Sequence, residues 1–198
     1  MTTLTAVPPE LAVGLPRHPY PGLRPFEPDE WPIFFGREQM CDEVIARLAA
    51  QHLVVVHGAS GSGKSSLVRA GVLPWLDLDH ARSGKGWKRA LMRPSGGPLR
   101  NLARELAGQL GPPPGAEADA ATAWHDRLAL GRSVLADIEQ ALAARGGASL
   151  CVLIDQFEEL FRYAREHSPE EAALLVDLLC ALADPDQRPA PHRTCSSS

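Results

Sequence analysis

The sequence lacks the features that direct a chain into or across a membrane. Met1 to Thr5 show no basic cluster followed by an apolar segment, and no stretch approaches the roughly 18 apolar residues that a transmembrane helix needs. Hydrophobic residues nevertheless make up 44% of the 198 residues, enough for a buried core. These observations predict a globular, cytoplasmic protein with no membrane partner.

Metal-binding and nucleic-acid-binding signatures are also missing. The four cysteines form no C-x-x-C pair, the seven histidines show no ligand spacing, and no run of Lys or Arg is interleaved with aromatic residues. The net charge is −4. We therefore expect no direct contact with nucleic acid, and we expect reduced thiols, mostly in the core, at Cys41, Cys151, Cys180 and Cys195.

One glycine-rich segment follows an apolar run, Leu53 to Val56, and precedes a helix-like sequence. This strand, loop and helix order is typical of a phosphate-binding P-loop, in which backbone N–H groups converge on phosphate oxygens. The alternative interpretation is a flexible Gly/Ser turn. The predicted phosphate-binding residues are Gly58, Ala59, Ser60, Gly61, Ser62, Gly63, Lys64, Ser65 and Ser66.

Two side chains of this loop carry specific chemistry in a P-loop. Lys64 is one of only three lysines in the chain, and its ammonium group is expected to reach the β- and γ-phosphates. The hydroxyl of Ser65 is expected to complete the coordination shell of Mg²⁺. The sequence thus predicts two cofactors, a nucleoside triphosphate and Mg²⁺.

A second candidate site follows the apolar run Leu150 to Ile154, which resembles a buried parallel strand. Asp155 comes directly after it, where it could hold Mg²⁺ through water opposite Ser65, the role called Walker B. Glu158 and Glu159 are the candidate catalytic acids, since either could orient the water that attacks the γ-phosphate. The alternative for one of them is a helix start, where acids are favoured electrostatically.

The order of elements along the chain predicts an α/β fold, a P-loop NTPase three-layer sandwich with a parallel sheet. Eight prolines among the first 32 residues predict an extended leader without regular structure over 1–32. A partial P-loop NTPase domain is expected over 33–184 and an irregular tail over 185–198. A second strand is expected from Trp87 to Met92, ended by Arg93 and Pro94.

Helices are predicted where apolar residues recur at helical spacing. One begins near Arg37, one follows the glycine-rich loop and closes over Gly71 to Trp75, and one carries Leu99 to Leu110 and stops at Gly111. Another carries Val134 to Leu142. The last starts at Ser168, with Pro169 at the first helical position and Glu171 at the third.

Four segments together closely resemble the nucleotide-binding domain of bacterial novel STAND NTPases, over roughly Tyr20 to Leu182. They are Tyr20 to Phe26, Phe34 to Glu38, Gly58 to Gly71 and Asp155 to Phe161. The resemblance implies an ATP-dependent signalling switch, closed with ADP and open and homo-oligomeric with ATP, often followed by WD repeats. It also implies that Phe35, Gly36 and Arg37 lie near the base and ribose, although Arg37 is equally compatible with a solvated helix start.

The resemblance fails near the end of the sequence. Relatives continue with a strand that ends in a sensor residue and then with a winged helix, whereas here three prolines fall within Pro185 to Pro191. Such a strand would lie between the P-loop strand and the Asp155 strand, so its loss would leave both unpaired. We therefore expect a truncated member of the family, from a frameshift near Arg188, with weak or no ATP hydrolysis as a fragment.

Three other functions compete with this interpretation. An ABC-type transport ATPase should carry its signature just before Asp155, but Ser95 to Gly97 is the only Ser-Gly-Gly. A small-molecule kinase should have an Arg-rich lid, and only Arg162 and Arg165 lie between Asp155 and the proline-rich tail. The third alternative is a remnant of a nucleotide-binding domain that no longer binds any ligand. Titration with ATP and GTP, with and without Mg²⁺, separates this remnant from the others.

Overall fold

The computed structural model describes residues 20–76, 86–117 and 119–184, so Cys195, the predicted tail 185–198 and most of the predicted leader lie outside the described residues. The chain forms two compact units. Unit 1 comprises Met1–Ala50 and Val54–Leu78, and unit 2 comprises Gln51–Leu53 and Asp79–Ser198. The expected single domain over 33–184 therefore contains parts of both units, and each is described by itself below.

The sheet of unit 2 is a pair of parallel strands, β1 (Trp87–Met92) and β2 (Ser149–Ile154). Both strands were predicted, and their parallel pairing, from Trp87 opposite Ser149 to Met92 opposite Ile154, is compatible with the predicted α/β class. Every residue of β2 is half-buried, less than the full burial that its apolar sequence predicts. The three-layer sandwich stays a prediction, because these are the only strands in the described part of the chain.

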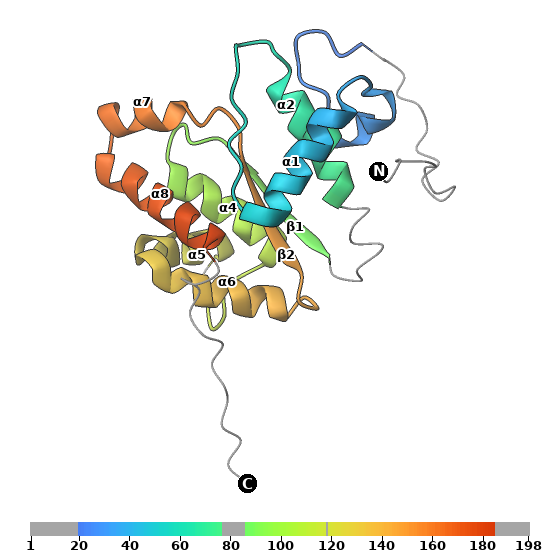
Figure 1. Cartoon of the computed structure of the whole chain (residues 1–198). Coiled ribbons are helices and arrows are strands. Elements are labelled where there is room, and N and C mark those ends of the chain that lie inside the picture. Colours follow the sequence, from blue (N-terminus) through green and yellow to red (C-terminus); the bar gives the residue numbers. More distant parts are fainter. Residues whose placement is uncertain (1–19, 77–85, 118, 185–198) are drawn as a thin grey trace. The chain divides into compact units, whose positions relative to one another are not determined.

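Three helices of unit 2 are α4 (Pro98–Leu110), α5 (Ala120–Ala129) and α6 (Val134–Ala143), with a short 3₁₀ turn, η3 (Gly131–Ser133), before α6 (Figure 1). Helices α4 and α6 confirm the predictions from leucine spacing. Helix α4 starts with Pro98 at its first position and ends at Gly111, whose φ of 63° suits a residue without a side chain. Helix α5 was not predicted, and Ala123, Trp124 and Leu128 are its buried residues.

Two further helices follow β2, namely α7 (Glu159–Glu166) and α8 (Pro169–Ala183). The predicted start of α8 is confirmed, since the Ser168 hydroxyl accepts a hydrogen bond from the backbone N–H of Glu171 at 3.0 Å. The Glu171 carboxylate does not return to Ser168. It instead accepts from the N–H of Leu99 at 3.0 Å and from the Tyr163 hydroxyl at 2.6 Å, which ties α8 to α4 and α7.

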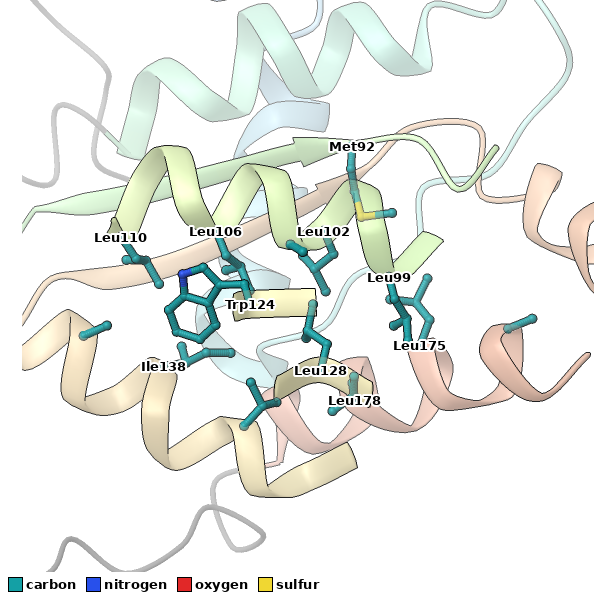
Figure 2. Packing of buried hydrophobic residues seen from close by; sticks show 14 of the residues in the cluster. Met92, Leu99, Leu102, Leu106, Leu110, Trp124, Leu128, Ile138, Leu175 and Leu178 are labelled. Carbon is teal, nitrogen blue, oxygen red and sulfur yellow. The ribbon is translucent and has the colours of Figure 1, made fainter. Parts of the chain in front are cut away.

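The core of unit 2 is one apolar cluster shared by β1, α4, α5, α6, α7 and α8. Trp124 lies within it with no exposed surface, among Leu106, Leu110 and Ile138 (Figure 2). Its indole N–H donates to the carbonyl of Gly111 at 2.7 Å, so the buried polar atom is satisfied. This cluster packs the helices of unit 2 against its strands.

Unit 1 contains helical segments before and after the glycine-rich loop in the sequence. They are η1 (Pro28–Ile33), α1 (Glu38–Gln51), α2 (Lys64–Ser66) and a π-helical turn, η2 (Leu67–Val72). The expectation of no regular structure over 1–32 is wrong for η1, because Pro28 occupies the first helical position, where no N–H is needed. Helix α1 confirms the helix predicted near Arg37.

The helix after the loop also differs from expectation. It does not close over Gly71 to Trp75 but continues to Leu76, with a π-turn over Leu67–Val72. Pro74 explains the irregular turn, since its ring cannot donate to the carbonyl of Ala70 and crowds it. The wider turn accommodates that proline without ending the helix.

The predicted strand Leu53 to Val56 is not formed, and this is the main correction to the sequence-based fold. These residues have no strand assignment, and Val55 is 78% exposed. A strand exists only through hydrogen bonds to a neighbouring strand, and none of the described residues supplies one here. The apolar sequence from Leu53 to Val56 is therefore not sufficient by itself to predict a strand.

Candidate functional site

The glycine-rich loop has positive φ angles at its three glycines. Gly58, Gly61 and Gly63 have φ angles of 157°, 76° and 86°, values that residues with a Cβ rarely adopt. A Cβ on Gly58 would lie 3.2 Å from the Ser62 Oγ, whereas a Cβ on Gly61 or Gly63 would have no atom within 4 Å. The loop needs glycine at Gly61 and Gly63 for conformation, and at Gly58 also for space.

Lys64 folds back over this loop. Its ammonium group donates to the carbonyl oxygens of Gly58, at 2.9 Å, and Ala59, at 3.0 Å. The loop itself is closed by a hydrogen bond from the Ser62 N–H to the Ala59 carbonyl at 3.2 Å. The cation is therefore held above the exposed residues Gly58 to Gly63, where it can meet an anion.

The residues that follow Lys64 are tied to the segment before α1. The Ser66 hydroxyl accepts from the N–H of Phe26 at 3.1 Å, and Arg69 forms an ion pair with Glu27 at 2.9 Å. Ser65, the predicted Mg²⁺ ligand, is half-buried between Lys64 and Ser66. The start of the helix is thereby fixed by two polar contacts with a segment forty residues earlier in the chain.

The residues expected near the base and ribose form the turn before α1. Phe35 is 76% exposed, and Gly36 has a φ of 80° and donates to the Glu38 carboxylate at 2.9 Å. The Glu38 backbone N–H and this contact lower the pKa of Glu38. Arg37 is exposed and its guanidinium lies 3.2 Å from the Met40 sulfur. The nucleotide-binding role of Phe35, Gly36 and Arg37 stays a prediction.

Asp155 lies at the carboxyl end of β2, as predicted. Its N–H donates to the carbonyl of Met92 at 3.0 Å, which extends the pairing of the two strands by one step. Its side chain is only 15% exposed, and one carboxylate oxygen lies 3.8 Å from the Arg93 guanidinium. A carboxylate at this edge of a parallel sheet is positioned for metal binding in α/β proteins.

The two candidate catalytic acids have different surroundings. Glu158 is exposed, whereas Glu159, the first residue of α7, is half-buried. One oxygen of Glu159 is buried without a hydrogen-bond partner among the described residues, and the other lies 3.8 Å from Arg162. Glu159 also lines an open pocket of about 430 Å³ together with Ser95, Gly96 and Tyr163. Of the two acids, Glu159 is therefore the one with a buried oxygen that accepts no hydrogen bond from the described residues.

The glycine-rich loop and Asp155 belong to different units. Ser65 is in unit 1, and Asp155, Glu158 and Glu159 are in unit 2, so their joint action on one metal ion stays a prediction. Arg93 is the residue that sequence reasoning missed, having been interpreted only as a strand end. The signal was available, because Arg93 and Asp155 each follow a predicted strand and parallel strands end at the same sheet edge.

Parallel strands with helices packed against them define an α/β protein, here with a glycine-rich loop ahead of the strands. The model of the family Novel STAND NTPase 1 matches residues 19–194. The chain belongs to this family, which confirms the resemblance drawn from Tyr20 to Phe26 and the three other segments. No curated protein and no solved structure matches the chain. No helix in the described ranges is both long enough and apolar enough to cross a membrane.

Proposed function

We propose that this chain binds ATP with Mg²⁺ as the nucleotide-binding part of a STAND-type regulatory switch. Membership in an NTPase family implies nucleotide use, and the loop from Gly58 to Ser66 supports the assignment of the phosphate site. The observation that carries the proposal is the combination of glycine-specific φ angles with an ammonium group held over the same loop.

The loop can perform each part of phosphate binding. Its exposed backbone amides can donate to phosphate oxygens, and the helical segment that begins at Lys64 directs its positive end toward the loop. On binding, Lys64 exchanges two neutral carbonyl acceptors for charged phosphate oxygens, which form stronger charge-assisted hydrogen bonds. Asp155 and Ser65 each supply the kind of oxygen ligand that Mg²⁺ takes, and Mg²⁺ keeps several waters.

Calorimetric titration of the 198-residue chain with ATP and Mg²⁺ tests the proposal. We expect binding that Lys64→Ala weakens by at least about ten-fold, as loss of a charged hydrogen bond predicts. Lys88→Ala is the matched control, since it removes a lysine from β1 in unit 2. Absence of binding by the unaltered chain, or equal effects of the two variants, would contradict the proposal.

Hydrolysis is expected to be slow, because an arginine finger from another subunit typically contributes about 10³–10⁵ in rate. Between the two acids we favour Glu159 as the group that orients water, because its buried oxygen lacks a donor among the described residues. Glu159→Gln should then lower the residual rate more than Glu158→Gln. Turnover near one per second that Lys64→Ala abolishes would overturn the expectation of slow hydrolysis.

A further inference from the structure

Arg93 stands next to Asp155 at the end of the parallel strand pair. It follows the last residue of β1 just as Asp155 follows the last residue of β2, and its guanidinium lies 3.8 Å from the Asp155 carboxylate. The arginine side chain is 52% exposed, and the aspartate is 15% exposed. The guanidinium is therefore more accessible to solvent than the carboxylate with which it pairs.

The backbone around Arg93 is held in place by Asn101 of α4. The Asn101 amide donates to the carbonyl of Arg93 at 2.9 Å and to that of Ser95 at 2.8 Å. The following Gly96 and Gly97 have φ angles of 76° and 131°, which turn the chain into α4. The base of the Arg93 side chain is thus fixed at the sheet edge, while its exposed end can change direction.

We propose that Arg93 is a phosphate-contacting residue that exchanges partners when nucleotide binds. The pair with Asp155 is one position of its guanidinium, and the guanidinium turns to a phosphate oxygen when Mg²⁺ occupies Asp155. This inference rests on the proposed function, because it requires a phosphate that shares the metal ion with Asp155.

Three physical arguments support the exchange. Mg²⁺ is held in proteins by one or two carboxylates together with substrate phosphates, so a phosphate on this ion lies close to Asp155 and hence within reach of Arg93. The arriving ion repels the guanidinium from the carboxylate that both would occupy. A half-exposed ion pair at 3.8 Å is weak, whereas a guanidinium binds phosphate with two parallel hydrogen bonds.

A simpler role for Arg93 would be to neutralise Asp155 without touching the nucleotide. The two roles differ in their response to lysine and to loss of the aspartate charge. If Arg93 only neutralises Asp155, a lysine can replace it, and its charge becomes unnecessary once Asp155 is replaced by asparagine. A phosphate contact requires the forked guanidinium and persists when the carboxylate is gone.

The test measures affinity for ATP with Mg²⁺ in the 198-residue chain, using a fluorescent ATP analogue. We expect Arg93→Gln to weaken binding about ten-fold or more, and Arg93→Lys to weaken it several-fold. Arg93→Gln should also weaken binding when added to Asp155→Asn. Arg104→Gln, an exposed arginine on α4, is the matched control and should bind like the unaltered chain. Circular dichroism verifies that each variant is folded.

The outcomes separate this inference from the proposed function. Binding by the unaltered chain that falls with Lys64→Ala but not with Arg93→Gln overturns the inference alone. The same holds if Arg93→Lys binds like the unaltered chain, or if the effect of Arg93→Gln disappears in the Asp155→Asn background. Absence of any binding by the unaltered chain overturns the proposed function and this inference together.

Discussion

The two units are stabilised in different ways. Unit 2 has a continuous apolar cluster around Trp124 that joins strands and helices. Unit 1 also buries apolar residues, among them Leu73 and Leu76, but polar contacts such as Glu30 with Arg24 and Glu27 with Arg69 join its segments as well, and its loop is exposed. The comparison teaches that one continuous apolar cluster fixes the unit carrying Asp155, whereas the unit carrying the phosphate loop combines a smaller set of buried apolar residues with directional polar contacts.

The largest expected effect comes from the centre of the unit 2 core. Trp124→Ala should lower the free energy of unfolding by about 3–5 kcal/mol, because it leaves a cavity and removes the hydrogen bond to Gly111. Urea unfolding followed by circular dichroism measures this. Val55→Ala in unit 1 is the contrasting variant and should cost less than about 0.5 kcal/mol, since Val55 is 78% exposed. Similar costs for both variants would break the comparison.

Gly71 is a tightly packed point of unit 1. A Cβ there would lie 2.3 Å from the Cys41 sulfur and 3.4 Å from the Phe34 ring. Gly71→Ala should therefore destabilise the protein by about 1–3 kcal/mol, in spite of the better helix propensity of alanine. In a Cys41→Ala background the same change should be nearly neutral. Thermal unfolding of the unaltered chain, Gly71→Ala, Cys41→Ala and the double variant measures both effects. If the destabilisations of the two single variants simply add in the double variant, the steric explanation is contradicted.

Glu30 makes the stability of unit 1 dependent on pH. Hydrogen bonds from Arg24 and from the N–H of Glu27 lower the pKa of Glu30 to about 2, from a usual value of 4.5. A lowered pKa means that its contribution is complete above pH 4.5 and is lost as the pH falls toward 2. Glu30→Gln should cost about 1–2 kcal/mol at pH 7, discounted because Arg24 is half-exposed.

Unfolding measured between pH 7 and pH 2 distinguishes this contact from general acid destabilisation. The difference between the unaltered chain and Glu30→Gln should shrink below pH 4.5. Glu43→Gln, which changes an exposed carboxylate on α1, is the control and should leave the profile unaltered. A constant difference across the whole range would show that Glu30 acts by packing alone.

The smallest expected effect is at the start of α8 in unit 2. Ser168→Ala removes the acceptor for the Glu171 N–H and should cost about 1 kcal/mol. Ser168→Asp retains an acceptor at this position and should restore most of the stability. If the aspartate variant is as unstable as the alanine variant, the hydroxyl acts through another contact, such as that with Glu170 at 3.2 Å.

Local sequence signals predicted most of unit 2. The leucine spacing of α4, the Gly111 stop and the Ser168 cap all act within one or two helical turns, and all three are confirmed. The strands β1 and β2 were also located correctly. The pairing of Arg93 with Asp155 was missed because the two residues are far apart in the sequence and only the strand register brings them together.

The sequence by itself indicated the glycine-rich loop, because glycine at positions 58, 61 and 63 permits the positive φ angles found there. It also determined the helices whose caps and apolar faces are local. Only the tertiary structure decided that Leu53 to Val56 forms no strand, that Glu171 joins α8 to α4 and α7, and that Arg93 faces Asp155. The physical reason is that a strand or an ion pair needs a partner from elsewhere in the chain, whereas a turn or a helix cap finds its partner within a few residues.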